Sequence, residues 1–265
     1  MKTYDMIVIG SGSGALNIGV FMVKAGFKVL MIEKNEANIG GDCLNSGCVP
    51  SKALIHISRE VAAARRSQEY GVKVSGKVNF TKVKEYIESK QNHIRVHENK
   101  EYFEELGFDV VIGDAEFAGK REVRVGEDIY KAKKILVAIG GRPRKLQIPG
   151  IDKLEYGKTY LDNESVFSLD ELPKELVVIG GGPIGLEIGQ ALQRLGSQVT
   201  VVQREDTFLP KEHSDITPIL RDQLEAEGMK FMMGCSPIKI LSSNALEVKP
   251  ENGKKVTLSF DAVLI

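Results

Sequence analysis

The feature that most constrains the fold of this chain is a glycine-rich turn that occurs twice, at residues 10–15 (GSGSGA) and 180–185 (GGGPIG). Each copy lies between a short apolar run and a helical stretch. Both copies match G-x-G-x-x-G/A, in which the first glycine allows a tight turn and the second lets the backbone approach a pyrophosphate. The third position must be small so that the helix packs on the strand. One such match is weak, because glycine turns also serve as ordinary tight connections.

The two copies agree in their spacing as well as in their turns. Glu33, at the end of the next strand, lies 23 residues after Gly10, and Gln203 lies 23 residues after Gly180. Two strand–turn–helix–strand units predict an α/β chain with two Rossmann-like dinucleotide-binding domains. We place these domains at residues 1–148 and 149–265, because a loop rich in glycine and proline precedes residue 150. Predicted pyrophosphate contacts are Gly10, Gly12, Gly14 and Ala15 in the first copy, and Gly180, Gly182, Ile184 and Gly185 in the second.

The apolar patterning predicts the remaining elements. Helices are expected after the first glycine turn (10–15) to about residue 25, at 51–66, at 81–106, after the second turn (180–185) to about residue 195, and at 215–227. Strands are expected at 6–9, 28–33, 109–112, 122–125, 134–139, 176–179, 198–202, 230–233, 245–249 and 255–260. Residues 261–265 have the character of the middle of an apolar strand, so we expect the second domain to be incomplete at its C-terminal end.

Composition excludes several classes of protein. Lys and Arg number 36, as do Asp and Glu, so a net charge of zero removes the usual electrostatic basis for nucleic-acid binding. No apolar run approaches the roughly 20 residues of a membrane helix. The apolar run at 6–9 is too short for a signal peptide, and three cysteines are too few for a secreted disulfide scaffold. We therefore expect a cytoplasmic protein without nucleic-acid or membrane partners.

The residues at the two strand ends distinguish between dinucleotides. Glu33 can accept hydrogen bonds from the ribose hydroxyls of a nucleotide that lacks a 2′-phosphate, as in FAD or NAD. The equivalent place in the second copy holds neutral Gln203, followed by Arg204, whose guanidinium can pair with a phosphate. The second copy is therefore expected to favour NADPH over NADH. The nearby Glu205 and Asp206 oppose that preference, and Arg204 as an ordinary solvated residue stays an alternative.

Cys43 and Cys48 form a C-x4-C pair in a glycine-rich loop that leads into a helix beginning near Pro50. A helix N-terminus lowers the pKa of a thiol, and Lys52 adds positive charge nearby. A disulfide closing so short a loop adds little stability, so reactivity explains the pair better. Two alternatives stay open. The pair could be half of a zinc site, although no second Cys/His pair has ligand spacing, or it could be two inert buried thiols. Cys235 is expected to be a buried thiol.

Taken in order, these motifs resemble the FAD-dependent pyridine nucleotide–disulfide oxidoreductases, a family that includes dihydrolipoyl dehydrogenase, glutathione reductase and mercuric reductase. The resemblance spans essentially the whole chain, through the first turn, the cysteine loop at 40–52, the segments at 138–143 and 148–150, and the second turn. The loop sequence, GDCLNSGCVPSKAL, is most similar to the mercuric-reductase-like branch, as is the stretch at 97–113.

The resemblance implies FAD in the first domain and NADPH or NADH in the second. Electrons would pass to a Cys43–Cys48 disulfide and then to a small-molecule disulfide, dithiol or metal-ion acceptor. Cys48 would face the flavin, and Cys43 would exchange with substrate. Lys52 would pair with Glu187 near the flavin. Further residues that the resemblance assigns to FAD are Glu33, Lys34, Gly41, Asp42, Lys52, Ala115, Ala138 and Gly140. It assigns no resident metal site.

The chain also departs from the family pattern. Asp42 replaces a common threonine, and Pro183 stands where some members carry an aromatic gate. Members continue into a dimerisation domain with a His–Glu acid–base pair, which 265 residues do not hold. No histidine here fits that role; they are His56, His93, His97 and His213. We expect a fragment that lacks full turnover, from a homodimeric parent. The alternatives are a redox-sensing nucleotide-binding module and a flavin reductase acting on a quinone, oxygen or metal without the disulfide.

Overall fold

The computed structural model describes residues 2–207 and 209–265, and the chain divides into two compact units. The first unit comprises Met1–Pro50 and Glu88–Arg142, and the second comprises Ser51–Ile87 and Pro143–Ile265. This division by contacts differs from the sequence-based boundary near residue 148, because the helical segment at 51–87 packs with the C-terminal part of the chain. The functional division into an FAD part and an NAD(P) part stays a prediction.

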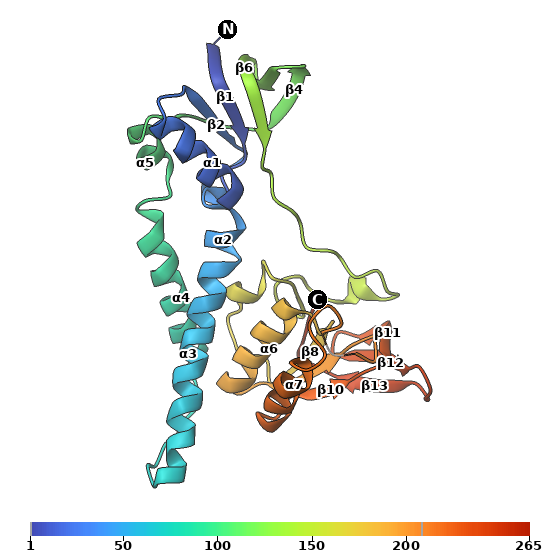
Figure 1. Cartoon of the computed structure of the whole chain (residues 1–265). Helices are drawn as coiled ribbons and strands as arrows, with labels where there is room; N and C mark the ends of the chain where they lie inside the picture. The colour runs from blue at the N-terminus through green and yellow to red at the C-terminus, as the bar shows by residue number, and fades with distance from the viewer. Residues whose placement is uncertain (1, 208) are drawn as a thin grey trace. The chain divides into compact units, whose positions relative to one another are not determined.

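The first unit contains a six-stranded sheet in the order β3-β2-β1-β6-β5-β4 (Figure 1). Its strands are β1 (Lys2–Ile9), β2 (Val29–Glu33), β3 (Asp109–Ile112), β4 (Ala115–Gly119), β5 (Glu122–Val125) and β6 (Asp128–Val137). β3, β2, β1 and β6 run parallel, whereas β6, β5 and β4 form an antiparallel meander. The sequence did not predict β4, because its residues are mostly exposed and carry no apolar alternation.

The first unit also contains several helices. They are α1 (Ser13–Lys24), the short η1 (Glu36–Asn38) and α2 (Gly41–Asn45), the end of α4 (Phe80–Arg95), and α5 (Lys100–Glu105). The single helix expected at 81–106 is wrong. The chain breaks it after Arg95, and Asn99 begins α5 by accepting a hydrogen bond from the Tyr102 backbone N–H at 2.8 Å. An asparagine at a helix start satisfies an N–H group that would otherwise lack a partner, so the break is locally stable.

The second unit contains two sheets. A parallel sheet has the order β10-β9-β8-β14-β7 and an antiparallel one the order β11-β12-β13. The strands are β7 (Tyr160–Leu161), β8 (Glu175–Ile179), β9 (Gln198–Val202), β10 (Lys230–Met232), β11 (Cys235–Ser242), β12 (Ala245–Pro250), β13 (Val256–Ser259) and β14 (Ala262–Leu264). The apolar end of the sequence is β14, which pairs with β8 and β7. β7 and β11 were not predicted; β7 has only two residues, too few to form a pattern.

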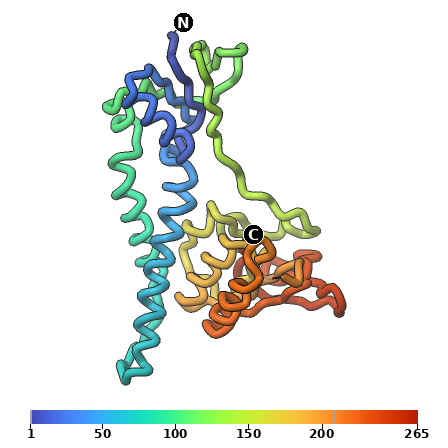
Figure 2. The backbone as a smooth tube through the Cα atoms, viewed as in Figure 1, coloured from blue at the N-terminus to red at the C-terminus, as the bar shows by residue number. Residues whose placement is uncertain are grey.

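The helices of the second unit are α3 (Cys48–Arg66, from Ser51 on), η2 (Ser67–Tyr70), the start of α4, η3 (Ile151–Lys153), η4 (Val166–Ser168), α6 (Pro183–Leu195) and α7 (Thr217–Ala226). Figure 2 shows α3 and α4 as a helical hairpin joined through residues 67–79. Leu54 and Val83 of this hairpin belong to the same buried cluster as Val178 of β8 and Leu192 of α6. Each such side chain contributes about 1.5–3 kcal/mol on burial, which explains why the hairpin groups with this unit.

The α/β prediction is confirmed, because both glycine turns join a strand of a parallel sheet to a helix. Among the helices that lie within residues 2–207 and 209–265, none has both the length and the apolar character to cross a membrane.

A partly buried ion pair joins the end of α7 to α6. Arg194 donates from Nε and Nη2 to the two carboxylate oxygens of Glu227, each at 2.7 Å, and the amides of Gln190 and Gln223 also donate to Glu227. Burial alone would raise the pKa of Glu227, but the hydrogen bonds from Arg194 and the glutamines outweigh it, so the pKa lies below its ordinary value. The pair therefore stabilises the fold at neutral pH.

We predict that Arg194→Met lowers the free energy of unfolding by about 2 kcal/mol at pH 7, because it leaves a largely buried carboxylate without its cation. The folded-state pKa of Glu227 lies below its unfolded-state pKa. The contribution of the ion pair to the free energy of unfolding is therefore present above about pH 4.3 and is lost as the pH falls through the folded-state pKa. Urea unfolding at pH 7 and pH 4 measures this, and the difference between wild type and variant should shrink at pH 4.

Lys158→Met is the matched control, because Lys158 pairs with Glu155 while both side chains are mostly exposed. It should leave the free energy of unfolding nearly unchanged, because an exposed ion pair contributes little to stability. Two results would contradict the stabilising role of the pair. One is a loss of unfolding free energy in Arg194→Met no larger than in the control, and the other is a loss in Arg194→Met that is the same at both pH values.

Candidate functional site

The first glycine turn leads into α1 without a side chain that caps the start of the helix. The Gly10 N–H donates to the Ile32 carbonyl at 2.8 Å, and a Cβ on Gly10 would strike the carbonyl oxygen of Ala138, which only glycine avoids. Gly12 is the N-cap residue of α1 and supplies no capping side chain. A Cβ on Gly14 would meet no atom within 4 Å. The first N–H groups of α1 therefore have no side-chain partner, as is typical of helix starts that bind phosphate groups.

The second glycine turn repeats this construction. Gly180, at φ +101°, donates from its N–H to the Val202 carbonyl at 2.9 Å. Gly182 is the N-cap of α6, again without a capping side chain, and a Cβ there would meet nothing within 4 Å. A Cβ on Gly185 would lie 2.9 Å from the Gly180 carbonyl oxygen, so the third glycine is needed for α6 to pack against the turn.

The buried side chains at the two strand ends hold these turns. Oε2 of Glu33 accepts from the N–H and hydroxyl of Ser11 at 3.0 and 2.7 Å, and Oε1 accepts from the Lys34 N–H at 2.7 Å. In the second copy, Oε1 of Gln203 accepts from the Gly181 N–H at 2.7 Å. The sequence predicted only ligand contacts for Glu33 and Gln203. It missed Ser11, whose hydroxyl could have been recognised as a partner for a nearby carboxylate.

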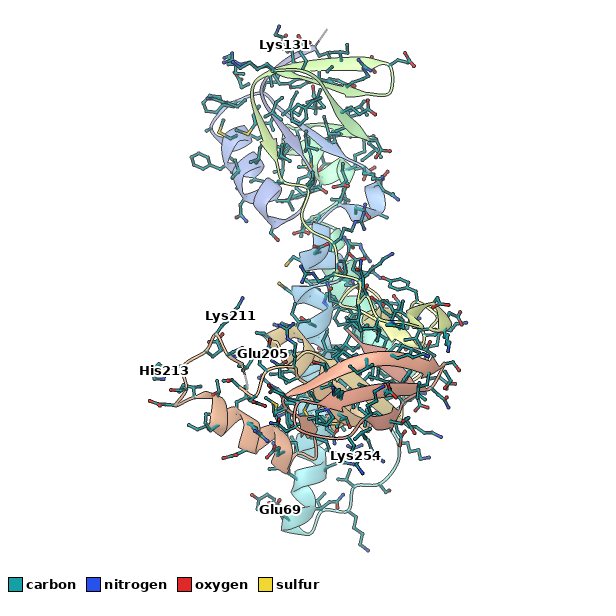
Figure 3. All side chains as sticks on the ribbon, turned by 90° about the vertical axis from the view of Figure 1, so that its right-hand side faces the viewer. Glu69, Lys131, Glu205, Lys211, His213 and Lys254 are labelled. Carbon is teal, nitrogen blue, oxygen red and sulfur yellow. The ribbon has the colours of Figure 1, made fainter. Side chains whose placement is uncertain are left out.

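A chain of hydrogen bonds continues from Gln203 along the loop after β9. Gln203 Nε2 donates to Oε2 of Glu205 at 2.6 Å, and Arg204 donates from Nη2 to Oε1 of Glu205 at 2.8 Å. The hydrogen bond from Arg204 lowers the pKa of Glu205. Figure 3 labels Glu205 on this loop. The exposed guanidinium of Arg204 therefore already has a carboxylate partner, which a 2′-phosphate would have to replace.

Apart from Lys52, which lies in the second unit, the other residues predicted to line FAD belong to the first unit and fall into two groups. A Cβ on Gly140 would lie 3.8 Å from Oδ2 of Asp42, and the Ala138 N–H donates to the Ile9 carbonyl at 2.9 Å next to the first turn. Lys34 instead forms an exposed ion pair with Asp114 at 3.0 Å, next to Ala115 at the start of β4.

The cysteine pair lies at the junction of α2 and α3. Cys43 belongs to α2, Cys48 is the first residue of α3, and both are present as thiols. Cys43 forms hydrogen bonds with Cys48 and with the hydroxyl of Ser13. Burial raises the pKa of Cys43, the interaction with Cys48 raises it further, and Ser13 opposes both. Cys235 is buried as predicted, and burial raises the pKa of its thiol.

The cysteine loop is in backbone contact with the first glycine turn. Gly41 has φ +59°, and a Cβ there would lie 2.5 Å from the Cα of Gly12. Later in the loop, a Cβ on Gly47 would lie 2.8 Å from the Asp42 carbonyl oxygen. These approaches need glycine, and they place the cysteine pair next to the turn predicted to hold the FAD pyrophosphate.

Lys52 and Glu187 meet within the second unit. Lys52 Nζ lies 2.9 and 2.8 Å from the two carboxylate oxygens of Glu187, while 59% and 45% of the two side chains remain exposed. An ion pair so exposed contributes little to stability. The pairing expected from the family resemblance is therefore present in geometry, and its role in chemistry stays a proposal.

The histidines take up ordinary structural or surface positions. His56 stacks on Tyr86 and His97 packs edge-on against Tyr102. His213, labelled in Figure 3, is exposed and lies 3.6 Å from Asp215. Over the parts of the chain that the structure describes, His, Cys, Asp and Glu do not gather in groups of three or more that could hold a metal ion.

Comparison with known proteins gives a consistent result. Residues 4–265 match the family described as pyridine nucleotide-disulphide oxidoreductase. A mercuric reductase from Lysinibacillus sphaericus is 29% identical over 99% of the chain, and mitochondrial dihydrolipoyl dehydrogenase 1 from Arabidopsis thaliana is 35% identical over 98%. The HOCl-induced flavoprotein disulfide reductase RclA from Escherichia coli superposes with a TM-score of 0.82 over 99% of the chain, at 28% identity.

These relatives are about twice as long as the chain. The alignments cover 47% of the mercuric reductase, 52% of the Arabidopsis enzyme and 56% of the RclA chain.

The contact between Gly41 and Gly12 generates a stability prediction. Gly41→Ala should lower the free energy of unfolding by about 3 kcal/mol, because the new Cβ combines a left-handed backbone cost with a clash against backbone that cannot yield. Gly126→Ala is a matched control: Gly126 has φ +58°, and a Cβ there meets nothing within 4 Å. It should lose only about 1 kcal/mol. Urea unfolding measures both variants, and equal losses would show that the contact is not a constraint.

Proposed function

This chain belongs to the pyridine nucleotide-disulphide oxidoreductase family, and we propose that it carries the dinucleotide cradles and the redox-active cysteines of a flavoprotein oxidoreductase. Members of this family use FAD and NAD(P)H. The proposed reaction passes electrons from NAD(P)H through FAD to Cys43 and Cys48, and then to an acceptor. Because the chain spans about half the length of its relatives, the tests below address single steps rather than turnover.

The observation that carries the proposal is the position of the cysteine pair. Two thiols in hydrogen-bonding contact can close a disulfide with the release of two protons and two electrons. Their loop touches the first glycine turn through Gly41 and Gly12. A pair that merely stabilised the fold would need no such contact with a phosphate cradle, and closing so short a loop would add little stability.

The residues of the first unit fit FAD. Gly12 leaves the start of α1 without a capping side chain, and a Cβ on Gly14 would meet no atom within 4 Å, so backbone N–H groups there can bind the pyrophosphate. A carboxylate offers about four acceptor positions, and the hydrogen bonds from Ser11 and Lys34 use three of those on Glu33. One position remains for a ribose hydroxyl, so Glu33 can hold its turn and a nucleotide together. When bound, FAD would supply the two-electron carrier between the nicotinamide and the thiols.

For the second unit we propose NADPH rather than NADH. Gln203 brings no negative charge to the strand end, and the exposed Arg204 can pair with a 2′-phosphate in place of Glu205. Gly180, Gly182, Ile184 and Gly185 would form the pyrophosphate cradle. The catalytic role of the Lys52–Glu187 pair is proposed from the family resemblance alone.

The proposed acceptor is a small molecule that reacts with thiols: a disulfide, a dithiol or a metal ion. Relatives named mercuric reductase and dihydrolipoyl dehydrogenase support this range. Cys43 is the proposed exchanging residue, and Cys48 the one that faces the flavin. A homodimeric full-length parent stays a prediction from the family resemblance, and a cytoplasmic location stays a prediction from the short N-terminal apolar run and the few cysteines.

The main test combines absorbance with a count of thiols. The oxidised chain with bound FAD should gain two thiols after anaerobic addition of one equivalent of NADPH. It should also develop a long-wavelength absorbance band from a thiolate beside the flavin. Cys43→Ser should abolish the gain of two thiols, whereas Cys235→Ser, which changes a buried thiol outside the pair, should retain it.

Other outcomes would favour the alternative functions. Nucleotide binding without flavin reduction would favour a redox-sensing module. Flavin reduction with unchanged quinone or oxygen reduction in Cys43→Ser would favour a direct flavin route. Either result would contradict the proposed use of the cysteine pair.

The Arg204–Glu205 pair yields a prediction for coenzyme preference. Glu205→Gln should tighten NADP⁺ binding relative to NAD⁺ by about threefold, because it removes an exposed carboxylate that competes for Arg204. Arg204→Glu should weaken NADP⁺ alone. Calorimetric titration of both coenzymes measures the ratio, and an equal loss of both in Arg204→Glu would refute contact with the 2′-phosphate.

A further inference from the structure

A side chain far away in the sequence holds the turn between the two cysteines. α2 has only five residues, and the last carbonyl oxygens of a helix lack N–H partners within it. Gln91 of α4 donates to two of these oxygens: its Nε2 lies 3.0 Å from the Leu44 carbonyl oxygen and 3.0 Å from the Asn45 carbonyl oxygen. Gln91 is 8% exposed, so water competes little for these hydrogen bonds.

A second contact from the same face of α4 reaches the same turn. Arg95, one helical turn after Gln91, donates from Nη2 to Oδ1 of Asn45 at 3.0 Å. The Asn45 amide then donates to the Gly41 carbonyl at 3.0 Å and the Ile39 carbonyl at 3.2 Å. These residues all belong to the first unit. Backbone and side chain of Asn45, midway between the cysteines, are thus both fixed from α4.

We propose that Gln91 is a positioning residue for the cysteine pair. By fixing the Leu44–Asn45 turn, it keeps Cys43 and Cys48 within reach of each other and raises the equilibrium constant for closing their disulfide. A loop held in one geometry keeps its two thiols together more of the time than a mobile loop does, and this raises the effective concentration of one thiol near the other. This inference rests on the proposed redox use of the pair.

Oxidised dithiothreitol provides a balanced reaction that needs neither flavin nor nicotinamide. Its S–S bond breaks as a bond forms between the sulfurs of Cys43 and Cys48. Two protons and two electrons pass from the protein to the probe, which leaves as the dithiol. The equilibrium constant is measured by acid quenching and alkylation of the full chain in dithiothreitol buffers, with peptide mass determination to identify the Cys43–Cys48 bond.

Gln91→Met keeps the length of the side chain and removes both donors. It should lower the equilibrium constant about tenfold, because hydrogen bonds that favour the closed geometry are lost. Arg95→Met acts on the same turn through Asn45 and should lower the constant about threefold, which keeps the test available if Gln91→Met does not fold.

Gln193→Met is the matched control. Gln193 donates to the Glu227 carbonyl at 3.2 Å in the second unit, so its loss should affect thermal stability but change the disulfide equilibrium less than about twofold. The inference is overturned if the equilibrium constant for disulfide closure in Gln91→Met or Arg95→Met stays within twofold of the wild-type value, whatever the melting temperature. A wild-type chain that never closes the bond overturns both the inference and the proposed function.

Discussion

The approach of the Gly41 backbone to the Gly12 backbone is the contact on which the candidate site depends. It joins two motifs that the sequence keeps apart, the first glycine turn and the cysteine loop. Side chains could not make this junction, because any Cβ on Gly41 would force the two segments apart. α2 therefore sits directly against the start of α1, and Cys43 comes within hydrogen-bonding reach of Ser13. Because glycine has no side chain at this contact, the Cys43 thiol lies next to the first glycine turn.

The two glycine turns are held by side chains that differ in one atom, a carboxylate oxygen in Glu33 and an amide nitrogen in Gln203. Glu33 and Gln203 occupy equivalent places and accept hydrogen bonds from equivalent turns. The carboxylate can only accept, so it gathers N–H and O–H donors around it. The amide also donates, so it attracts Glu205, which in turn attracts Arg204. The hydrogen bonds in the loop after β9 thus follow from the replacement of a carboxylate oxygen by an amide nitrogen.

The sequence predicted the features whose signals are local. Both turns, the strands and helices beside them, and the α/β class follow from apolar runs next to glycines. The pairing of Lys52 with Glu187 came from the family resemblance. Exposed β4 and two-residue β7 lack such signals, and the break before α5 depends on one capping asparagine. The grouping of residues 51–87 and the contact of Gln91 with Leu44 join segments distant in sequence, so no local pattern reveals them.

The position of β14 has a consequence for biosynthesis. β14 lies between β8 and β7, yet it contains residues 262–264, and all three are buried. As the polypeptide emerges from the ribosome, β8 can join β9 early but must wait more than eighty residues for its other neighbour. Until then β8 presents an unpaired edge of apolar residues, which is a template for association with other nascent chains. Chaperone protection of this edge would matter most during that interval of translation.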